Sequence, residues 1–159
     1  MCLVIDTCCI PPVFDRNNQN HPTFAPILEW ITRGNGRMIY GGTKYNEELG
    51  RAARYLRFVG ELNRKGRTIQ MPKQDVDAIA EKLKERIRHP AFNDEHLVAL
   101  VIASRCCVVC TNDTTAIMYL RRPDLYTADK VRRPKIYRYR SHRNMCCDAN
   151  LAPICRRGN

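Results

Sequence analysis

The stretch at residues 92–113 decides the fold, and it reads FNDEHLVALVIASRCCVVCTND. Its first part opens with the helix-starting residues Asn93 and Asp94 and then becomes apolar nearly all round, which predicts a helix buried on most sides. Its second part contains a short apolar run at 108–110 followed by Thr-Asn-Asp, which is typical of a buried strand in a parallel sheet. The stretch therefore predicts a carboxylate, Asp94, in the first turn of a buried helix. It predicts another, Asp113, just beyond the C-terminal end of a buried strand.

The N-terminus repeats the second arrangement, because residues 2–5 form an apolar run that Asp6 ends. In an open α/β sheet, binding sites form in the crevice beyond the carboxyl ends of the strands. Two strands that both end in Asp would bring two carboxylates into that crevice, where they repel unless a cation lies between them. Such a site suits Mg²⁺ or Mn²⁺, which prefer oxygen ligands.

The remaining apolar patterns alternate between strand and helix periods. We expect strands at 38–40, 68–71 and 136–140, helices at 25–32, 43–65 and 74–87, and a short helix ending at Leu120 that Thr114 or Thr115 caps. This alternation predicts an α/β fold in which helices sandwich a mainly parallel central sheet.

The segment 43–65 is predicted to be the longest helix. Its predicted buried stripe contains Tyr45, Leu49, Ala52, Leu56 and Val59. At ~100° per residue, Glu48 lies on the margin of this stripe and can reach a crevice, whereas Glu47 should face water.

Four acidic residues now have defined positions along the chain, with Leu3-Val4-Ile5-Asp6-Thr7 first and Glu48-Leu49 second. The third is within Asn93-Asp94-Glu95-His96-Leu97-Val98-Ala99-Leu100 and the fourth within Val109-Cys110-Thr111-Asn112-Asp113. In order and spacing over residues 1–140, this set resembles the PIN domain, the metal-dependent ribonuclease fold that includes VapC-type toxins.

The resemblance implies a single PIN-like domain that hydrolyses RNA phosphodiester bonds with Mg²⁺ or Mn²⁺. Carried over by position, the metal-binding acids are Asp6, Asp94 and Asp113, the fourth catalytic acid is Glu48, and the rim residues are Thr7, Thr111 and Asn112. Metal-activated water would attack the phosphodiester in line and leave a 5′-phosphate and a 3′-hydroxyl. The resemblance also implies that the enzyme is the toxin of a toxin–antitoxin pair, covered by an antitoxin protein, and that it forms homo-oligomers.

Each acid also has a purely structural explanation. Asp94 and Asp113 are suitable helix N-caps, Asp6 suits a turn, and Glu48 suits a solvated helix face. We expect His96 to be partly exposed and to have no role in the site.

The chain carries a formal net charge of +11, with a pI of about 9.5. Residues 121–159 hold 11 Lys and Arg against 3 Asp and Glu, a balance of +8, so the first 120 residues carry only +3. Within this basic part, cations alternate with tyrosines that could stack on unpaired bases. The predicted RNA-binding residues are Arg132, Arg133, Lys135, Tyr137, Arg138, Tyr139 and Arg140. The alternative is an edge strand that its charges protect from aggregation.

The nine cysteines bear on the redox state of the compartment in which the protein works, more than on a zinc-binding motif. Neither a signal peptide nor an apolar run of ~20 residues is present, so we expect a cytoplasmic protein with reduced thiols and no membrane partner. We expect Cys2, Cys8, Cys107 and Cys110 to be small buried apolar residues. Zinc binding, with Cys146, Cys147 and Cys155 as the best ligands, is a less favoured alternative. We divide the chain into a nuclease domain at 1–143 and a basic, Cys-containing tail at 144–159.

Two rival functions come from other classes. A receiver-type signalling domain also has acids at strand ends, but it should carry an acidic pair after the first strand, where this chain has Asp6 and Thr7. A non-catalytic RNA-binding module could keep a PIN-like fold without the acids, all of which are present here.

Overall fold

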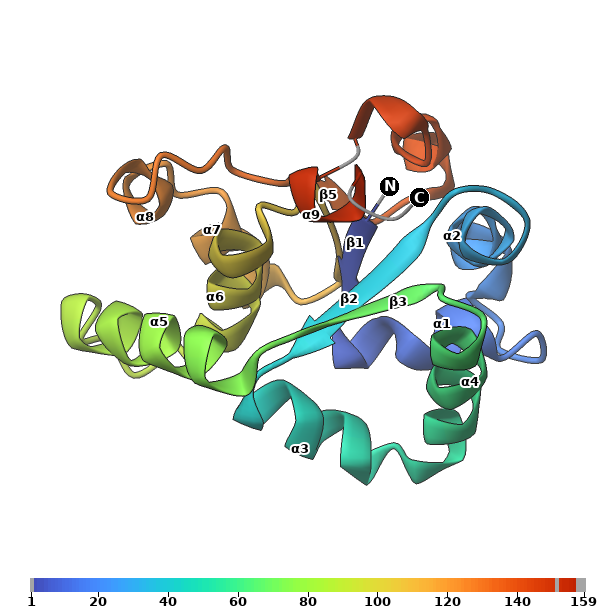
Figure 1. The fold of residues 1–159 in the computed structure, drawn as a ribbon, viewed down its shortest axis with the longest axis horizontal. Helices are drawn as coiled ribbons and strands as arrows, with labels where there is room; N and C mark the ends of the chain where they lie inside the picture. Colours follow the sequence, from blue (N-terminus) through green and yellow to red (C-terminus); the bar gives the residue numbers. More distant parts are fainter. Residues whose placement is uncertain (1, 151, 157–159) are drawn as a thin grey trace.

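In the computed structural model, which describes residues 2–150 and 152–156, all the strands are parallel and belong to one sheet. The strands are β1 (Cys2–Ile5), β2 (Arg37–Gly41), β3 (Thr68–Met71), β4 (Val108–Cys110) and β5 (Lys135–Tyr137). Their order in the sheet is β3-β2-β1-β4-β5. Helices flank the sheet (Figure 1). The predicted α/β fold, with its parallel sheet between helices, is therefore confirmed.

Helices α1 to α8 lie in the connections between successive strands, as parallel strands require, and α9 follows the last strand. They are α1 (Ile10–Phe14), α2 (His21–Arg33), α3 (Thr43–Arg51), α4 (Ala53–Arg64), α5 (Lys73–Arg86), α6 (Glu95–Ser104), α7 (Thr114–Leu120), α8 (Asp124–Thr127) and α9 (Pro153–Arg156). Short 3-10 turns are η1 (Thr7–Cys9), η2 (Arg140–Met145) and η3 (Asp148–Asn150).

The strand order reverses between β1 and β4, which pair in parallel through Val4–Val109 and Ile5–Cys110. Such a reversal opens a crevice beyond the carboxyl ends of the two strands, and this is where ligands bind in open α/β sheets. Asp6 follows β1 there, and its backbone N–H donates to the Cys110 carbonyl (2.9 Å). The order also differs from the 2-1-3-4-5 order of receiver domains, which counts against that rival.

Helix α6 is buried almost completely, as its apolar sequence predicts. All eight side chains from Glu95 to Ile102 are buried, including those of the polar residues Glu95 and His96. Its N-terminal end lies next to Asp94, and its C-terminal end is closed by Arg105 in the left-handed conformation (φ 54°). The helix therefore has an acidic residue, Asp94, at its start and a basic residue, Arg105, at its end.

The single long helix predicted for residues 43–65 is wrong, because the chain breaks at Ala52 (φ −91°, ψ 45°) into α3 and α4. The break changes which side of the second segment is buried. Leu56 is 43% exposed instead of buried, and Tyr55 is buried in its place. Helix α4 packs against α1, where the Phe14 and Phe58 rings stack with centroids 6.4 Å apart.

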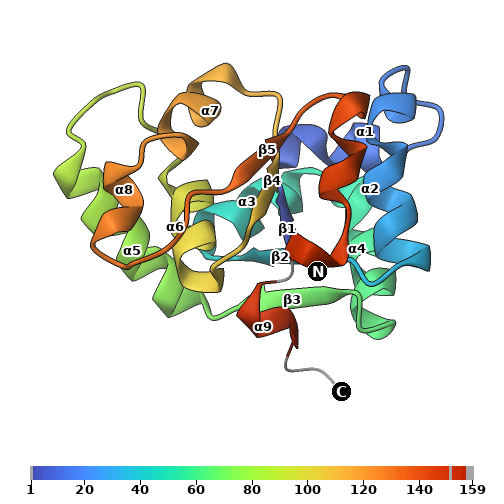
Figure 2. The same ribbon diagram turned by 90° about the horizontal axis from the view of Figure 1, so that it is seen from above.

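The C-terminal part of the chain packs back onto the domain. Strand β5 ends at Tyr137, three residues earlier than predicted, and the chain then turns into η2. Asn35 donates from Nδ2 to Asp148 Oδ2 (3.0 Å), and α9 lies near the start of β1 (Figure 2). No helix among the described residues is long and apolar enough to cross a membrane.

Cys2 and Cys155 form a disulfide, so the prediction that all thiols are reduced is wrong for this pair. The other seven cysteines, all of which the structure describes, are free. Two of the four cysteines predicted to be buried are not, since Cys8 is exposed and Cys107 is only half-buried.

Candidate active site

The hydroxyl of Thr111 joins the ends of the two central strands. Its Oγ1 donates to Asp6 Oδ2 (2.5 Å) and accepts from the Asp113 backbone N–H (3.0 Å). Asp6 and Thr111 are both buried, so Thr111 lies beneath the rim on which we expected it. Tyr45 donates from its hydroxyl to the Ile5 carbonyl. These contacts fix the Asp6 carboxylate at the carboxyl end of β1.

Asp113 caps helix α7. Its Oδ1 accepts from the backbone N–H groups of Thr115 (2.7 Å) and Ala116 (3.1 Å), so Asp113, and not Thr114 or Thr115, caps α7. Two orphan amides of the helix are thereby satisfied. Asp113 is exposed, as is its neighbour Asn112, and its Oδ2 remains for another ligand.

Glu48 on α3 is half-buried, whereas its neighbour Glu47 is exposed. Thr7 donates from Oγ1 to Glu48 Oε2 (2.9 Å), and His96 Nε2 lies 3.5 Å from the same oxygen. His96 lowers the pKa of Glu48 below its ordinary value, with help from Thr7 and Lys44, whereas burial acts in the opposite direction. Glu48 is therefore held ionised.

Asp94 is at the N-cap position of α6, but its side chain makes no capping hydrogen bond. Its Oδ2 is buried without a hydrogen-bond partner among the described residues. Burial, followed by the charges of Asp113 and Asp6, raises the pKa of Asp94 to about 6. Asp6 and Asp113 are therefore near enough for their charges to act on Asp94, and their repulsion favours a cation between them.

Sequence reasoning missed three charged or titratable residues beside the acids. His96 is buried rather than partly exposed. Glu95 is also buried, and its Oε1 lies 3.3 Å from Lys44 Nζ. Lys44 also donates to the Asn93 carbonyl. The signal was available for His96 and Glu95, because a helix that is apolar all round buries its polar residues too.

The four acids have the donor chemistry for a metal ion but are not gathered around one. No group of three or more His, Cys, Asp or Glu side chains is already arranged to hold a metal in the part of the chain that the structure describes. The donors nevertheless have the chemistry that Mg²⁺ and Mn²⁺ prefer, since they are carboxylate oxygens and one of them, Asp94 Oδ2, is buried without a partner. The acids therefore fit the ion in chemistry, although their present arrangement is not closed around one.

The predicted RNA-binding residues do not all reach the surface. Tyr137 is completely buried and donates from its hydroxyl to the Thr23 carbonyl (3.0 Å), so its predicted stacking on bases is wrong. Tyr139 is 53% exposed, with the Arg138 guanidinium 5.4 Å from its ring centroid. The remaining cations are exposed, namely Arg132, Arg133, Lys135 and Arg140.

Comparisons of the chain with protein families, with curated proteins and with solved structures found no match.

Proposed function

We propose that this protein is a divalent-metal-dependent endoribonuclease whose active site lies beyond the carboxyl ends of β1 and β4. The observation that carries the proposal is the state of Asp94. Its Oδ2 is buried without a hydrogen-bond partner among the described residues, and burial, followed by the charges of Asp113 and Asp6, raises its pKa to about 6. A fold keeps such mutually repelling acids at a crevice at a cost to its stability, which a bound cation would offset.

Asp6, Asp94 and Asp113 would hold Mg²⁺ or Mn²⁺, with Glu48 as the fourth acid. When bound, the ion supplies a more acidic water and stabilises charge on the phosphoryl oxygens. The chain's own residues prepare the site. Thr111 fixes Asp6 and orders the start of α7, while Thr7 and His96 keep Glu48 ionised and oriented.

The test is cleavage of RNA by the full chain with Mg²⁺ or Mn²⁺. We expect a 5′-phosphate and a 3′-hydroxyl at the cut, and rates at least about 100-fold lower for Asp6→Asn and Asp94→Asn. Glu48→Gln has a matched control in Glu47→Gln, which removes an exposed carboxylate one residue away and should cleave like the wild type. Acid variants that cleave as fast as the wild type would contradict the proposed site.

A non-catalytic RNA-binding module is the second candidate, and the absence of a ready-made metal group among the described residues favours it. If the wild type binds RNA but cleaves nothing with either metal, this candidate replaces the nuclease. An antitoxin partner and a homo-oligomer stay predictions from the resemblance. We also keep the cytoplasm as the predicted location, because seven cysteines are free beside a single disulfide.

A further inference from the structure

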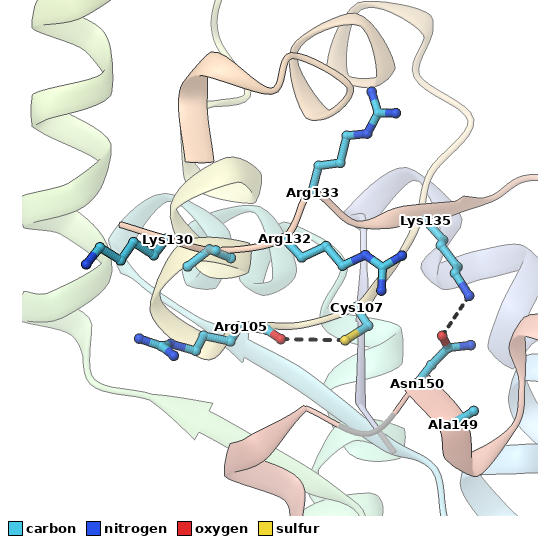
Figure 3. Close-up of a pocket in the computed structure, with 9 residues that line it drawn as sticks. Arg105, Cys107, Lys130, Arg132, Arg133, Lys135, Ala149 and Asn150 are labelled. Atoms are coloured by element: carbon cyan, nitrogen blue, oxygen red, sulfur yellow. Dashed lines mark hydrogen bonds between the residues drawn. The ribbon is translucent and has the colours of Figure 1, made fainter. Parts of the chain in front are cut away.

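The end of the sheet opposite the acids carries a basic hollow of about 250 Å³ (Figure 3). It lies where β4 and β5 begin and where α6 ends, so α6 separates it from Asp94 by roughly 15 Å, the length of a ten-residue helix. The cations that line it are Arg105, Lys130, Arg132, Arg133 and Lys135. Its other lining residues are uncharged, and none of them is Asp or Glu.

The charge in this hollow is not neutralised by the protein. Elsewhere lysines and arginines pair with carboxylates, as Lys84 does with Glu95 and Arg54 with Asp15. None of the five lining cations has an ion-pair partner among the described residues. The C-terminal end of α6 contributes only about half a negative charge, which is too little to balance five cations.

The side chains in the hollow are partly positioned in advance. Figure 3 shows the heads of Arg132 and Lys135 turned into the same space, with Cys107 and Asn150 on its wall. Asn150 accepts from Lys135 Nζ through its Oδ1 (3.0 Å) and is itself buried. This contact keeps the ammonium group facing the space. Two rim residues have unusual backbones, since Arg105 (φ 54°) and Lys130 (φ 52°) are left-handed, a conformation that costs a non-glycine residue energy and is concentrated at functional sites.

A second hollow of about 460 Å³ continues from the first along β5. Arg132, Arg133 and Lys135 line both hollows, and Arg121 adds another cation to the second. His142 also lines the second hollow, and its ring is 5.5 Å from the ring of the exposed Tyr139. A row of cations that ends beside an exposed aromatic ring is the arrangement that binds single-stranded nucleic acid, in which phosphates repeat and bases stack. Nucleic acid alone offers both repeating phosphates for the cations and bases that stack on the ring, so it is the ligand that matches the whole arrangement.

We infer that these two hollows form one phosphate-binding groove that holds a strand of RNA away from the acidic crevice. The choice of RNA as the ligand rests on the proposed function, whereas binding in the groove needs neither metal nor cleavage. Because the groove is remote from the acids, it should govern affinity and not the chemical step.

The test is the affinity of the full chain for a single-stranded RNA of about 12 nucleotides, measured by fluorescence anisotropy in EDTA. The variant Arg132→Gln/Lys135→Gln removes the two heads that point into the first hollow. For single strands each phosphate contact contributes about 0.7 to the slope of log affinity against log salt, which is about fivefold per contact near 0.1 M salt. We expect the double variant to bind about 25-fold more weakly, with a salt slope about 1.4 smaller.

The matched control is Arg64→Gln/Lys65→Gln, which removes one Arg and one Lys from exposed positions at the end of α4. It should bind RNA like the wild type. Equal affinities for the wild type and Arg132→Gln/Lys135→Gln, or equal weakening of both variants, would overturn the groove. Melting temperatures identify a variant that is simply unfolded. The variant Arg132→Lys/Lys135→Arg keeps both charges and should bind RNA like the wild type.

Two further ligands identify the source of the phosphate. Poly-glutamate should bind at least tenfold more weakly than the RNA, and equal binding would overturn the assignment to nucleic acid. If inorganic phosphate or a nucleoside monophosphate binds in the groove while RNA affinity is unchanged in Arg132→Gln/Lys135→Gln, the groove is a small-anion site and the RNA assignment fails. RNA binding with this pattern but no cleavage with Mg²⁺ or Mn²⁺ would refute the nuclease and leave the groove intact.

Discussion

At the scale of single residues, the site is a set of acids with unequal partners. Asp6 accepts a hydrogen bond from Thr111, Glu48 accepts one from Thr7, and Asp113 accepts from the amides of α7. Asp94 has the least support, because one of its oxygens is buried without a partner. The stability of the metal-free protein should therefore depend on the charge of this one residue.

Asp94→Asn should stabilise the metal-free protein above pH 6. The pKa of Asp94 is raised from 3.8 to about 6 by burial and by Asp113 and Asp6. Between those values the folded protein holds a proton that the unfolded chain has lost, so stability falls as pH rises through this window and stays low above it. Each unit of pKa shift corresponds to about 1.4 kcal/mol, and solvent reduces this value because Asp94 is only half-buried. The free energy of unfolding of the variant should therefore be about 1–2 kcal/mol higher than that of the wild type.

Urea unfolding of both proteins in EDTA, from pH 3.5 to 7.5, measures this effect. The two curves should meet near pH 3.5 and separate by pH 7, and a constant difference would contradict the cause that we assign. Asp75→Asn, which removes an exposed carboxylate from the first turn of α5, is the control and should not reproduce the separation. Added Mg²⁺ should stabilise the wild type more than Asp94→Asn.

The positions of the acids could be predicted from sequence, but their contacts could not. A carboxylate after an apolar run lies at a strand end wherever the run becomes a parallel strand, and this holds for Asp6 and Asp113. The bond from Thr111 to Asp6 depends on β1 and β4 being neighbours, which no local pattern contains. The burial of Tyr137 likewise depends on α2, since its ring packs near Phe24.

At the scale of elements, the N-terminal end of α6 is tied to two other helices through Glu95. Its Oε1 lies 3.3 Å from Lys44 Nζ on α3 and 3.1 Å from Lys84 Nζ on α5. The Glu95 side chain is 3% exposed, whereas those of Lys44 and Lys84 are 36% and 61% exposed. These pairs keep three helices together next to Asp94.

Glu95→Gln should lower the free energy of unfolding by about 1–2 kcal/mol. Removing one member of a fully buried ion pair costs about 3–5 kcal/mol, but here both lysines can turn into water when their partner is lost. Urea unfolding at neutral pH measures the difference. Glu85→Gln, an exposed position on α5, is the control and should change stability by less than about 0.5 kcal/mol. A Glu95→Gln variant as stable as the wild type would show that these pairs do not hold the helices.

Sequence periodicity succeeds for elements that are buried on a regular face and fails where tertiary contacts redirect the chain. Strand β3 and helix α6 match their predicted positions because burial alone determines their patterns. The break at Ala52 comes two residues after Gly50, a weak helix former, but Gly60 lies inside α4 without breaking it, so propensity alone does not place the break. The break lets α4 pack on α1, a contact between segments that are far apart in sequence.

At the scale of the whole molecule, the parallel sheet separates two kinds of charge. The carboxyl ends of β1 and β4 lead to the acids, and the opposite ends of β4 and β5 lead to the basic groove. An RNA strand bound in the groove at one end of the sheet would have to extend to the other end to reach the acids. This separation explains how a chain with a net charge of +11 can keep an acidic site.

The disulfide between Cys2 and Cys155 connects stability to the groove. It joins the first residue of β1 to α9 across 153 residues, with Cα atoms 6.3 Å apart. The chain that it anchors contributes Ala149 and Asn150 to the wall of the first hollow, and Asn150 holds Lys135. Releasing this end of the chain should therefore loosen the groove as well as the fold.

Cys155→Ser should lower the free energy of unfolding by about 2–5 kcal/mol, since chain entropy for a loop this long sets an upper value of about 5 kcal/mol. Dithiothreitol should lower the melting temperature of the wild type to that of the variant and leave the variant unchanged. Because Asn150 loses its anchor but every cation stays, RNA affinity should fall by less than about fivefold, the contribution of one phosphate contact. Cys8→Ser, which removes an exposed free thiol from η1 at the opposite end of the sheet, should match the wild type in both measurements. If dithiothreitol and Cys155→Ser change stability but leave RNA affinity intact, the disulfide supports the fold alone and the groove does not depend on the end of the chain.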